Sequence, residues 1–221
     1  MNLPDNLLGE AWYWTAWVVW LPVFALCLFR APWARLKDTE QLNVWLGMVV
    51  MLTLIWSMKA GVKPGLDLHL LGATVFVLSF GPYLAFVGLS IVLAAITLNG
   101  AAGVFAFAAN AILQAGTAVL VSQFLFRRLS RVLPTHFFVY IFVFGFLGAA
   151  LTIIAVGFVS AVFMVLADIY AWEYLFEEYF PYFFLLGFSE AWLSGMVMTL
   201  FVVYRPNWVL TFKDSCYLCD K

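Results

Sequence analysis

Polar side chains that could bind a ligand are few in this chain, and they stand inside long apolar runs. Glu190 and Ser194 are four residues apart, as are Asn110 and Gln114, so each pair would share one face of a helix. His69 stands at the start of another apolar run, beside Asp67. Polar groups are costly in hydrocarbon, so each needs a partner or a role. If they face inward together, they form one site; the alternative is that each only bonds a neighbouring helix.

Other features that could do chemistry are weaker. The chain contains no HExxH, GxSxG or GxxxxGK[ST] motif and no visible nucleophile–base pair, so we expect no enzyme activity and no ATP hydrolysis by this chain. Cys216 and Cys219 form a single CxxC pair, whereas a closed zinc site needs four ligands, and their role stays open. His136, close to Pro134, is expected to be structural.

Composition indicates where these residues must lie. Of 221 residues, 66% are hydrophobic and only 10% are charged, whereas soluble domains are about 25% charged. Such a chain cannot cover a water-exposed surface, and no basic face exists to bind nucleic acid. We therefore predict an all-α, polytopic membrane helix bundle in contact with the lipid bilayer, forming a single transmembrane domain over residues 1–221. The N-terminal residues lack a basic n-region and predict no cleavable signal peptide.

Apolar runs long enough to cross a membrane divide the chain into about seven spans. Their expected limits are about Ala11 to Phe29, Asn43 to Met58, Leu68 to Phe80, Tyr83 to Leu98, Val104 to Phe126, His136 to Ala167, and Tyr182 to Tyr204. The third span is short and stops at Gly81-Pro82, so residues 68–98 form either two spans or one re-entrant hairpin. Residues 205–221 would then form a tail.

The distribution of cationic residues predicts the orientation. With seven crossings and the N-terminus outside, nine Lys and Arg residues lie on the cytoplasmic side and two, Lys59 and Lys63, lie outside. The positive-inside rule favours this arrangement, with a cytoplasmic C-terminus. Because the third and fourth spans together return the chain to the same side, a hairpin in their place leaves the later orientation unchanged.

Four stretches, in order along the chain, resemble one family. Residues 1–8 read MNLPDNLL and resemble its MHIPDGFL start; residues 67–74 read DLHLLGAT and resemble its VHLLG segment, which also precedes a Gly-Pro. Residues 187–195 read GFSEAWLSG and resemble its GxxEALITG segment, and Ala109-Asn110 falls where the family has a similar pair. The chain thus resembles the CbiM/NikM type, the substrate-capture permease of energy-coupling-factor cobalt and nickel ABC transporters.

The resemblance implies a mechanism and a site. The N-terminal segment, residues 1–10, would insert into the bundle, and a divalent transition-metal ion would bind Met1, Asn2 and His69, with Met1 and His69 as metal ligands. Asp67, Asn110, Gln114, Glu190 and Ser194 would lie around this site or line the pore. No resident cofactor is implied; the nickel- or cobalt-like ion is the substrate. A separate ATPase and a coupling membrane subunit would supply energy, in a bacterial inner (plasma) membrane.

The sequence departs from the family at the residue that matters most. Position 2 is Asn where the family start has His, so an imidazole donor is replaced by an amide oxygen, a far weaker ligand for nickel or cobalt. Lower affinity, a different ion, or loss of capture would each follow from this change. The alternative function is therefore a non-transporting membrane scaffold or accessory protein on the same fold.

Overall fold

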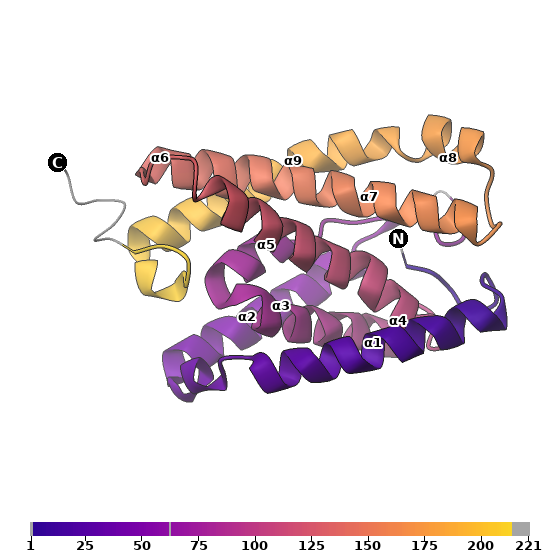
Figure 1. The fold of residues 1–221 in the computed structure, drawn as a ribbon, viewed down its shortest axis with the longest axis horizontal. Coiled ribbons are helices and arrows are strands. Elements are labelled where there is room, and N and C mark those ends of the chain that lie inside the picture. Colours follow the sequence, from indigo (N-terminus) through magenta and orange to yellow (C-terminus); the bar gives the residue numbers. More distant parts are fainter. Residues whose placement is uncertain (1, 62, 214–221) are drawn as a thin grey trace.

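The computed structural model describes residues 2–61 and 63–213, and almost all of its regular structure is helical. Met1, Cys216 and Cys219 therefore lie outside the described residues. Figure 1 shows the elements along the chain, which are α1 (Glu10–Arg30), η1 (Trp33–Lys37), α2 (Thr39–Ser57), β1 (Ala60–Gly61), β2 (Asp67–Leu68), α3 (Ala73–Leu98), α4 (Phe107–Asn110), η2 (Ala111–Gly116), α5 (Thr117–Leu129), α6 (Phe137–Val139), η3 (Tyr140–Leu147), α7 (Gly148–Leu166), α8 (Trp172–Glu178), α9 (Pro181–Tyr204) and η4 (Pro206–Trp208).

Six helices among the described residues are long and apolar enough to cross a membrane. They are α1, α2, α3, the continuous helix Phe107–Leu129 formed by α4, η2 and α5, the continuous helix Phe137–Leu166 formed by α6, η3 and α7, and α9. Large apolar side chains such as Val18, Phe29 and Leu120 lie exposed on the outside of the bundle, as lipid contact requires. The chain is a multi-pass membrane protein, and the predicted all-α bundle is confirmed.

The count of six differs from the predicted seven because α3 is a single element that reverses direction. Gly81 has φ 79° and ψ 170°, which is not helical and lies in a region that favours glycine. Phe76 and Gly88 are 12 residues apart, which is about 18 Å along a straight helix. A Cβ atom on Gly88 would nevertheless lie 2.6 Å from Cε1 of Phe76. Residues 73–80 and 82–98 are therefore two arms of a hairpin.

Contacts at each end of the arms show how deeply the hairpin reaches. Phe80 lies under the guanidinium of Arg35, with Cζ 5.3 Å from the ring centroid, at the end of the bundle that also holds η1 and η4. At the end of the second arm, the Ala101 carbonyl accepts a hydrogen bond from Lys59, and Gly103 bonds to Leu3. We call these two places the Arg35 end and the Asn2 end. The first arm and the extended chain before it thus cross most of the bundle, which accounts for the seventh predicted crossing.

Residues 205–212 pack against the bundle, whereas the sequence predicts a tail over residues 205–221. Val209 and Phe212 are buried, and the amides of Leu210 and Thr211 donate to the carbonyls of Ser79 and Leu78. Pro82 has no N–H group, so it cannot bond the Leu78 carbonyl four residues back. The returning chain supplies the missing donors, because an unsatisfied backbone group is costly within a membrane.

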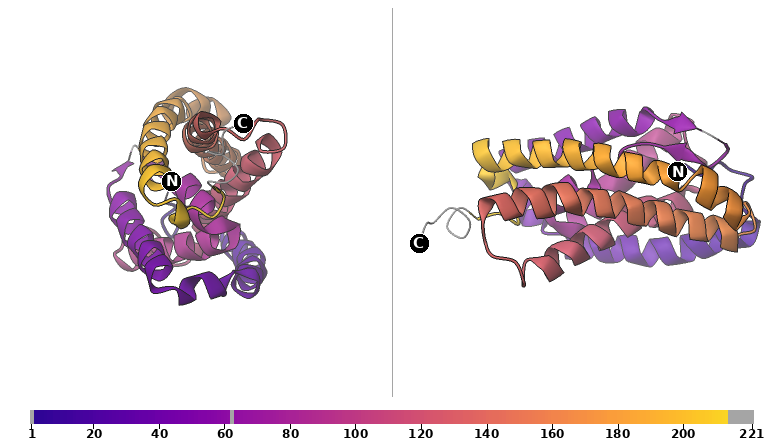
Figure 2. Two further views of the ribbon diagram at one scale, coloured as in Figure 1. Left: turned by 90° about the vertical axis from the view of Figure 1, so that its left-hand side faces the viewer. Right: turned by 90° about the horizontal axis from the view of Figure 1, so that it is seen from above.

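The remaining helices pack around this hairpin. The two views in Figure 2 show α7 and α9 side by side over most of their length. Gly145 in η3 faces Gly195 in α9, and the small residues let the two backbones approach closely. Helix α3 is the most buried of the six, since 83% of the residues in its 18-residue apolar stretch are buried inside the bundle. The core therefore forms around this helix.

Candidate functional site

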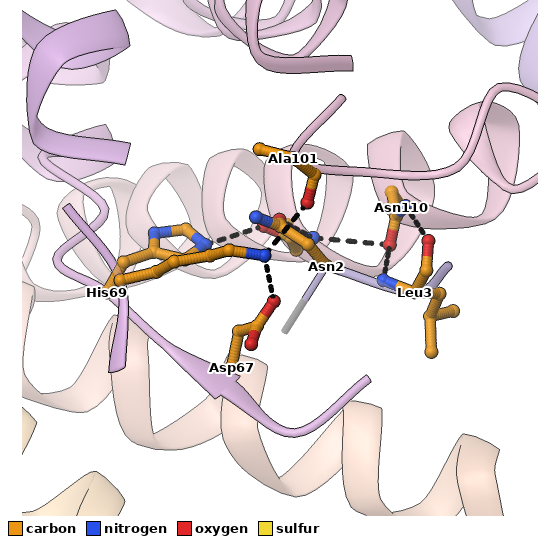
Figure 3. A network of polar contacts seen from close by, with 8 residues as sticks. Asn2, Leu3, Asp67, His69, Ala101 and Asn110 are labelled. Atoms are coloured by element: carbon orange, nitrogen blue, oxygen red, sulfur yellow. Dashed lines mark hydrogen bonds and ion pairs between the residues drawn. The ribbon is translucent and has the colours of Figure 1, made fainter. Parts of the chain in front are cut away.

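The N-terminal segment enters the bundle and is bonded there by Asn110. The Asn110 side chain accepts from the Leu3 amide at 2.8 Å and donates to the Leu3 carbonyl at 3.0 Å, as shown in Figure 3. Gly103 N–H donates to the same carbonyl at 3.1 Å. The Leu3 side chain is fully buried, and Asn2 is 2% exposed. The described start of the N-terminal segment is therefore buried and bonded to the helix that carries Asn110.

Residues further along the segment fix its entry angle. The Asp5 carboxylate accepts from the amides of Val104 and Ala106, at 2.9 and 3.0 Å. The Tyr13 hydroxyl accepts from the Leu8 amide at 3.1 Å and donates to the Pro4 carbonyl. Two separate elements, the loop before α4 and the first turn of α1, therefore hold the segment in place.

Gln114 joins the N-terminal segment to His69. Its Nε2 donates to the Asn2 side-chain oxygen at 3.2 Å, and its Oε1 lies 3.1 Å from Nε2 of His69 (Figure 3). Asn110 and Gln114 also contact each other, as their spacing predicts, with Gln114 Nε2 3.4 Å from Asn110 Oδ1. The Asn2 Nδ2 atom is buried and has no hydrogen-bond partner among the described residues. Side chains from three distant parts of the chain thus meet at one place.

Local helix geometry helps to place Gln114. Residues Ala111–Gly116 form the π-helical stretch η2 inside an otherwise α-helical span. A π-helical turn widens the helix and shifts the side chains that follow it, and such turns are frequent at functional sites. Gln114 and Asn110 are both fully buried and directed inward.

The imidazole of His69 is 2% exposed and faces a hydrogen-bond acceptor at each ring nitrogen. Its Nδ1 lies 3.1 Å from the Leu70 carbonyl, so both ring nitrogens face oxygen atoms. A neutral imidazole donates from only one nitrogen, so the other presents its lone pair. Its ring also lies against Trp56, with centroids 4.9 Å apart.

Glu190 supports the loop that carries His69 and does not itself face the amide network. Its carboxylate accepts from the amides of Leu71 and Gly72, at 2.9 and 2.6 Å, and from the Ser194 hydroxyl at 3.4 Å. These amides begin the first arm of α3, where a carboxylate is favoured by the helix dipole. The Leu71 carbonyl in turn accepts from the Trp56 indole at 3.0 Å. Ser194 thus bonds the Glu190 carboxylate, and Glu190 acts on the backbone of residues 71–72.

Asp67 lies at the mouth of the site. It pairs with Lys59 at 2.7 Å, and Lys59 also donates to the Ala101 carbonyl at 3.0 Å. A hollow of about 440 Å³ opens here at the Asn2 end; it is lined by Asn2, Pro4, Asp5, Lys59, Pro64, Asp67 and the loop of residues 100–103. This hollow connects the buried amide network to the outside of the bundle.

The donor set among the described residues is thin for a metal ion. No group of three or more His, Cys, Asp or Glu side chains comes together within residues 2–61 and 63–213. His69 offers one imidazole, and Asn2 and Gln114 offer amide oxygens. His136, the other histidine, caps α6 by accepting from the Phe138 amide at 3.2 Å, which agrees with its predicted structural role.

Three residues that position the site were not singled out from the sequence. Trp56 looks like an ordinary interfacial aromatic, and Lys59 and Asp5 look like charges outside the membrane. The opposite signs of Lys59 and Asp67, eight residues apart around a Gly- and Pro-containing stretch, were a usable signal for a turn closed by an ion pair.

Comparison with known proteins agrees with this architecture. Two solved structures share the fold: one described as a truncated transition metal transporter has a TM-score of 0.79 and 19% identity and covers 92% of this chain and 99% of its own, and one described as a transition metal transporter has a TM-score of 0.77 and 19% identity and covers 92% and 93%. A search of curated proteins gave no match. The family model for CbiM, described as the cobalt uptake substrate-specific transmembrane region, matches residues 2–208. The chain therefore belongs to the CbiM family.

Proposed function

We propose that this protein is the membrane substrate-capture component of an energy-coupling-factor type transporter for a divalent transition-metal ion. The observation that carries the proposal is the burial of Asn2 at 2% exposure, linked through Gln114 to His69. The N-terminal segment and an imidazole on a separate loop are the parts that a capture site between helices needs.

The chemistry of His69 suits a borderline-soft ion. Neutral imidazole binds nickel, cobalt, copper and zinc, and amide oxygens add weak, harder donors. A neutral imidazole presents its lone pair to an ion without releasing a proton. The ion would enter through the hollow beside Lys59 and Asp67 and take the place of the Gln114 oxygen at Nε2.

Met1 belongs to the proposed ligand set but lies outside the described residues. Its amine and the amide nitrogen of residue 2 would complete the coordination. Asn2 supplies an oxygen in place of an imidazole, so we propose nickel- or cobalt-like ions as substrates with lower affinity than a histidine at this position would give.

Energy must come from other subunits, since the sequence carries no phosphate-binding GxxxxGK[ST] loop. We therefore propose a separate ATPase and a coupling membrane subunit as partners, contacted from the Arg35 end. These partners would convert ATP hydrolysis into release of the ion on the other side of the membrane.

Calorimetry with nickel and cobalt on protein purified with a native N-terminus tests the site. His69→Ala should abolish binding, and a tag placed before Met1 should weaken it strongly. His136→Ala is the matched control, because His136 lies at the Arg35 end and only caps α6. Unchanged binding in both the His69→Ala and the tagged protein would overturn the proposal.

A second function is favoured by one specific observation. The Asn2 side-chain oxygen accepts a hydrogen bond from Gln114, and the Gln114 oxygen faces Nε2 of His69, so side chains that would bind an ion are hydrogen-bonded to one another. This favours a membrane scaffold or accessory protein on the same fold. Affinity purification discriminates: an ATPase subunit in the complex supports transport, whereas a stable complex with another membrane protein and no ATPase supports the scaffold.

A further inference from the structure

A second polar hollow lies at the Arg35 end, away from the capture site. It has a volume of about 490 Å³ and lies between the first turn of the second arm of α3 and the last turns of α5. Its polar lining consists of Tyr83, Gln123 and three arginines, Arg127, Arg128 and Arg131. None of these residues takes part in the amide network around His69.

The three arginines have no carboxylate partner among the described residues. The ion pairs recorded between described residues are Lys59–Asp67 and Arg205–Glu40, so none of the three is paired with a carboxylate in that part of the chain. Arg128 lies over the Phe124 ring, with Cζ 5.3 Å from the centroid, which leaves its N–H groups available. Arginine is the side chain best suited to bind a phosphate through two parallel hydrogen bonds.

The same face of α5 is apolar immediately beyond the arginines. Leu120 is 72% exposed and Phe124 is 57% exposed, and both also line the hollow. Residues 120, 124 and 127 recur at intervals of four and three, so they form one stripe along α5, and Arg131 follows in the turn just after the helix. The hollow therefore presents a cationic part at the end of the bundle and an apolar part that faces hydrocarbon.

We propose that this hollow is a binding site for an anionic phospholipid. The phosphate group would bind Arg127, Arg128 and Arg131, and an acyl chain would lie along Leu120 and Phe124. Basic pockets between membrane helices bind anionic head groups in this way. A free phosphate would bind the arginines but would not contact the apolar stripe. An acidic protein segment would likewise leave the apolar stripe without a partner.

The test compares lipid retention by purified protein. The wild-type chain is reconstituted in nanodiscs of phosphatidylcholine with a minor fraction of labelled phosphatidylglycerol, and the retained labelled lipid is measured after detergent extraction and by native mass spectrometry. The test variant is Arg127→Gln, Arg128→Gln, Arg131→Gln. The control is Arg30→Gln, Lys37→Gln, Lys213→Gln, which removes the same charge from exposed positions at the same end but outside the hollow.

We expect the arginine variant to lose phosphatidylglycerol affinity by roughly 100-fold, since each basic contact with an anionic lipid contributes about fivefold, and the control to retain it. A Lys substitution of all three arginines should fold and keep part of the affinity, which separates binding from misfolding. Equal loss in the control, unchanged retention in the arginine variant, or full competition by millimolar inorganic phosphate would each overturn the proposal. Normal lipid retention by the arginine variant, combined with loss of a partner subunit, would also overturn it.

Discussion

The side chain at position 2 is linked to His69 through Gln114. Asn2 presents an amide oxygen to Gln114, and its Nδ2 atom is buried without a described partner. An unsatisfied buried donor costs about 1–3 kcal/mol. Position 2 is thus the place where a single substitution changes the chemistry of the site most.

Replacing this amide by an imidazole should strengthen metal binding. Asn2→His adds a nitrogen ligand beside His69, and we expect nickel affinity to rise at least about tenfold, since even outer partners of a metal site change affinity by about 10–100-fold. Calorimetry measures the change. Asn6→His is the control, because Asn6 is exposed on the same segment; an equal gain in both variants would show adventitious binding.

Sequence spacing predicted part of the site at this scale. The i, i+4 spacing of Asn110 and Gln114 placed both on one helix face, and the resemblance placed His69 near the N-terminal segment. The role of Glu190 could not be predicted, because its partners are backbone amides. Their direction depends on the left-handed conformation of Gly72, with φ 62°, which no side-chain pattern encodes.

At the scale of elements, the hairpin within α3 depends on residues 205–212. Pro82 leaves the Leu78 carbonyl without its usual helical donor, and Thr211 supplies both its amide and its hydroxyl, the latter at 2.8 Å. The same hydroxyl lies 2.6 Å from that of Tyr140 in η3. One threonine thus joins three elements at the Arg35 end.

Thr211→Val keeps the shape of this side chain and removes its hydroxyl. We expect a loss of about 1–3 kcal/mol, because the hydroxyl makes two hydrogen bonds that each contribute about 0.5–1.5 kcal/mol, and a thermal midpoint lower by at least about 2–4 °C. Thr199→Val is the control, since the Thr199 hydroxyl bonds only to the Gly195 carbonyl of its own helix. Thermal unfolding in detergent measures both variants. Equal shifts would show that the hydrogen bonds of Thr211 between segments stabilise the protein no more than the bond of Thr199 within its helix.

The helices were largely predictable from the sequence, but the contacts that hold them to one another were not. Apolar runs and Gly81-Pro82 located the spans and the break in α3 to within a few residues. The packing of residues 209–212 was missed because their sequence is short and only partly apolar. Its physical cause, a carbonyl left free by Pro82, becomes visible only when the two segments are seen together.

At the scale of the molecule, charge separates between the two ends of the bundle. Arg35, Arg127, Arg131 and Arg205 lie at one end, together with Asp38 and Glu40, whereas Lys59 and Lys63 lie at the other end with Asp5 and Asp67. The positive-inside rule therefore predicts that the Arg35 end is cytoplasmic and the Asn2 end faces outward. This orientation is also the one that a capture site requires.

Cysteine labelling in intact cells tests the orientation. In a chain whose own cysteines are replaced by Ala, Lys63→Cys should react with a membrane-impermeant maleimide added outside. Thr135→Cys, in the exposed loop between α5 and α6, should react only after the cells are permeabilised. The reverse pattern would place the capture site on the cytoplasmic side and contradict the proposed direction of uptake.

The first arm of the α3 hairpin is fastened at both of its ends. Glu190 holds its beginning through the amides of Leu71 and Gly72, and Leu210 and Thr211 hold its far end, about 12 Å away for eight helical residues. The arm therefore links the loop that carries His69 mechanically to the Arg35 end, where the proposed partner subunits would bind. A partner that moved residues 209–212 away from Leu78 would free the far end of the arm, and the imidazole would lose its fixed position beside Gln114.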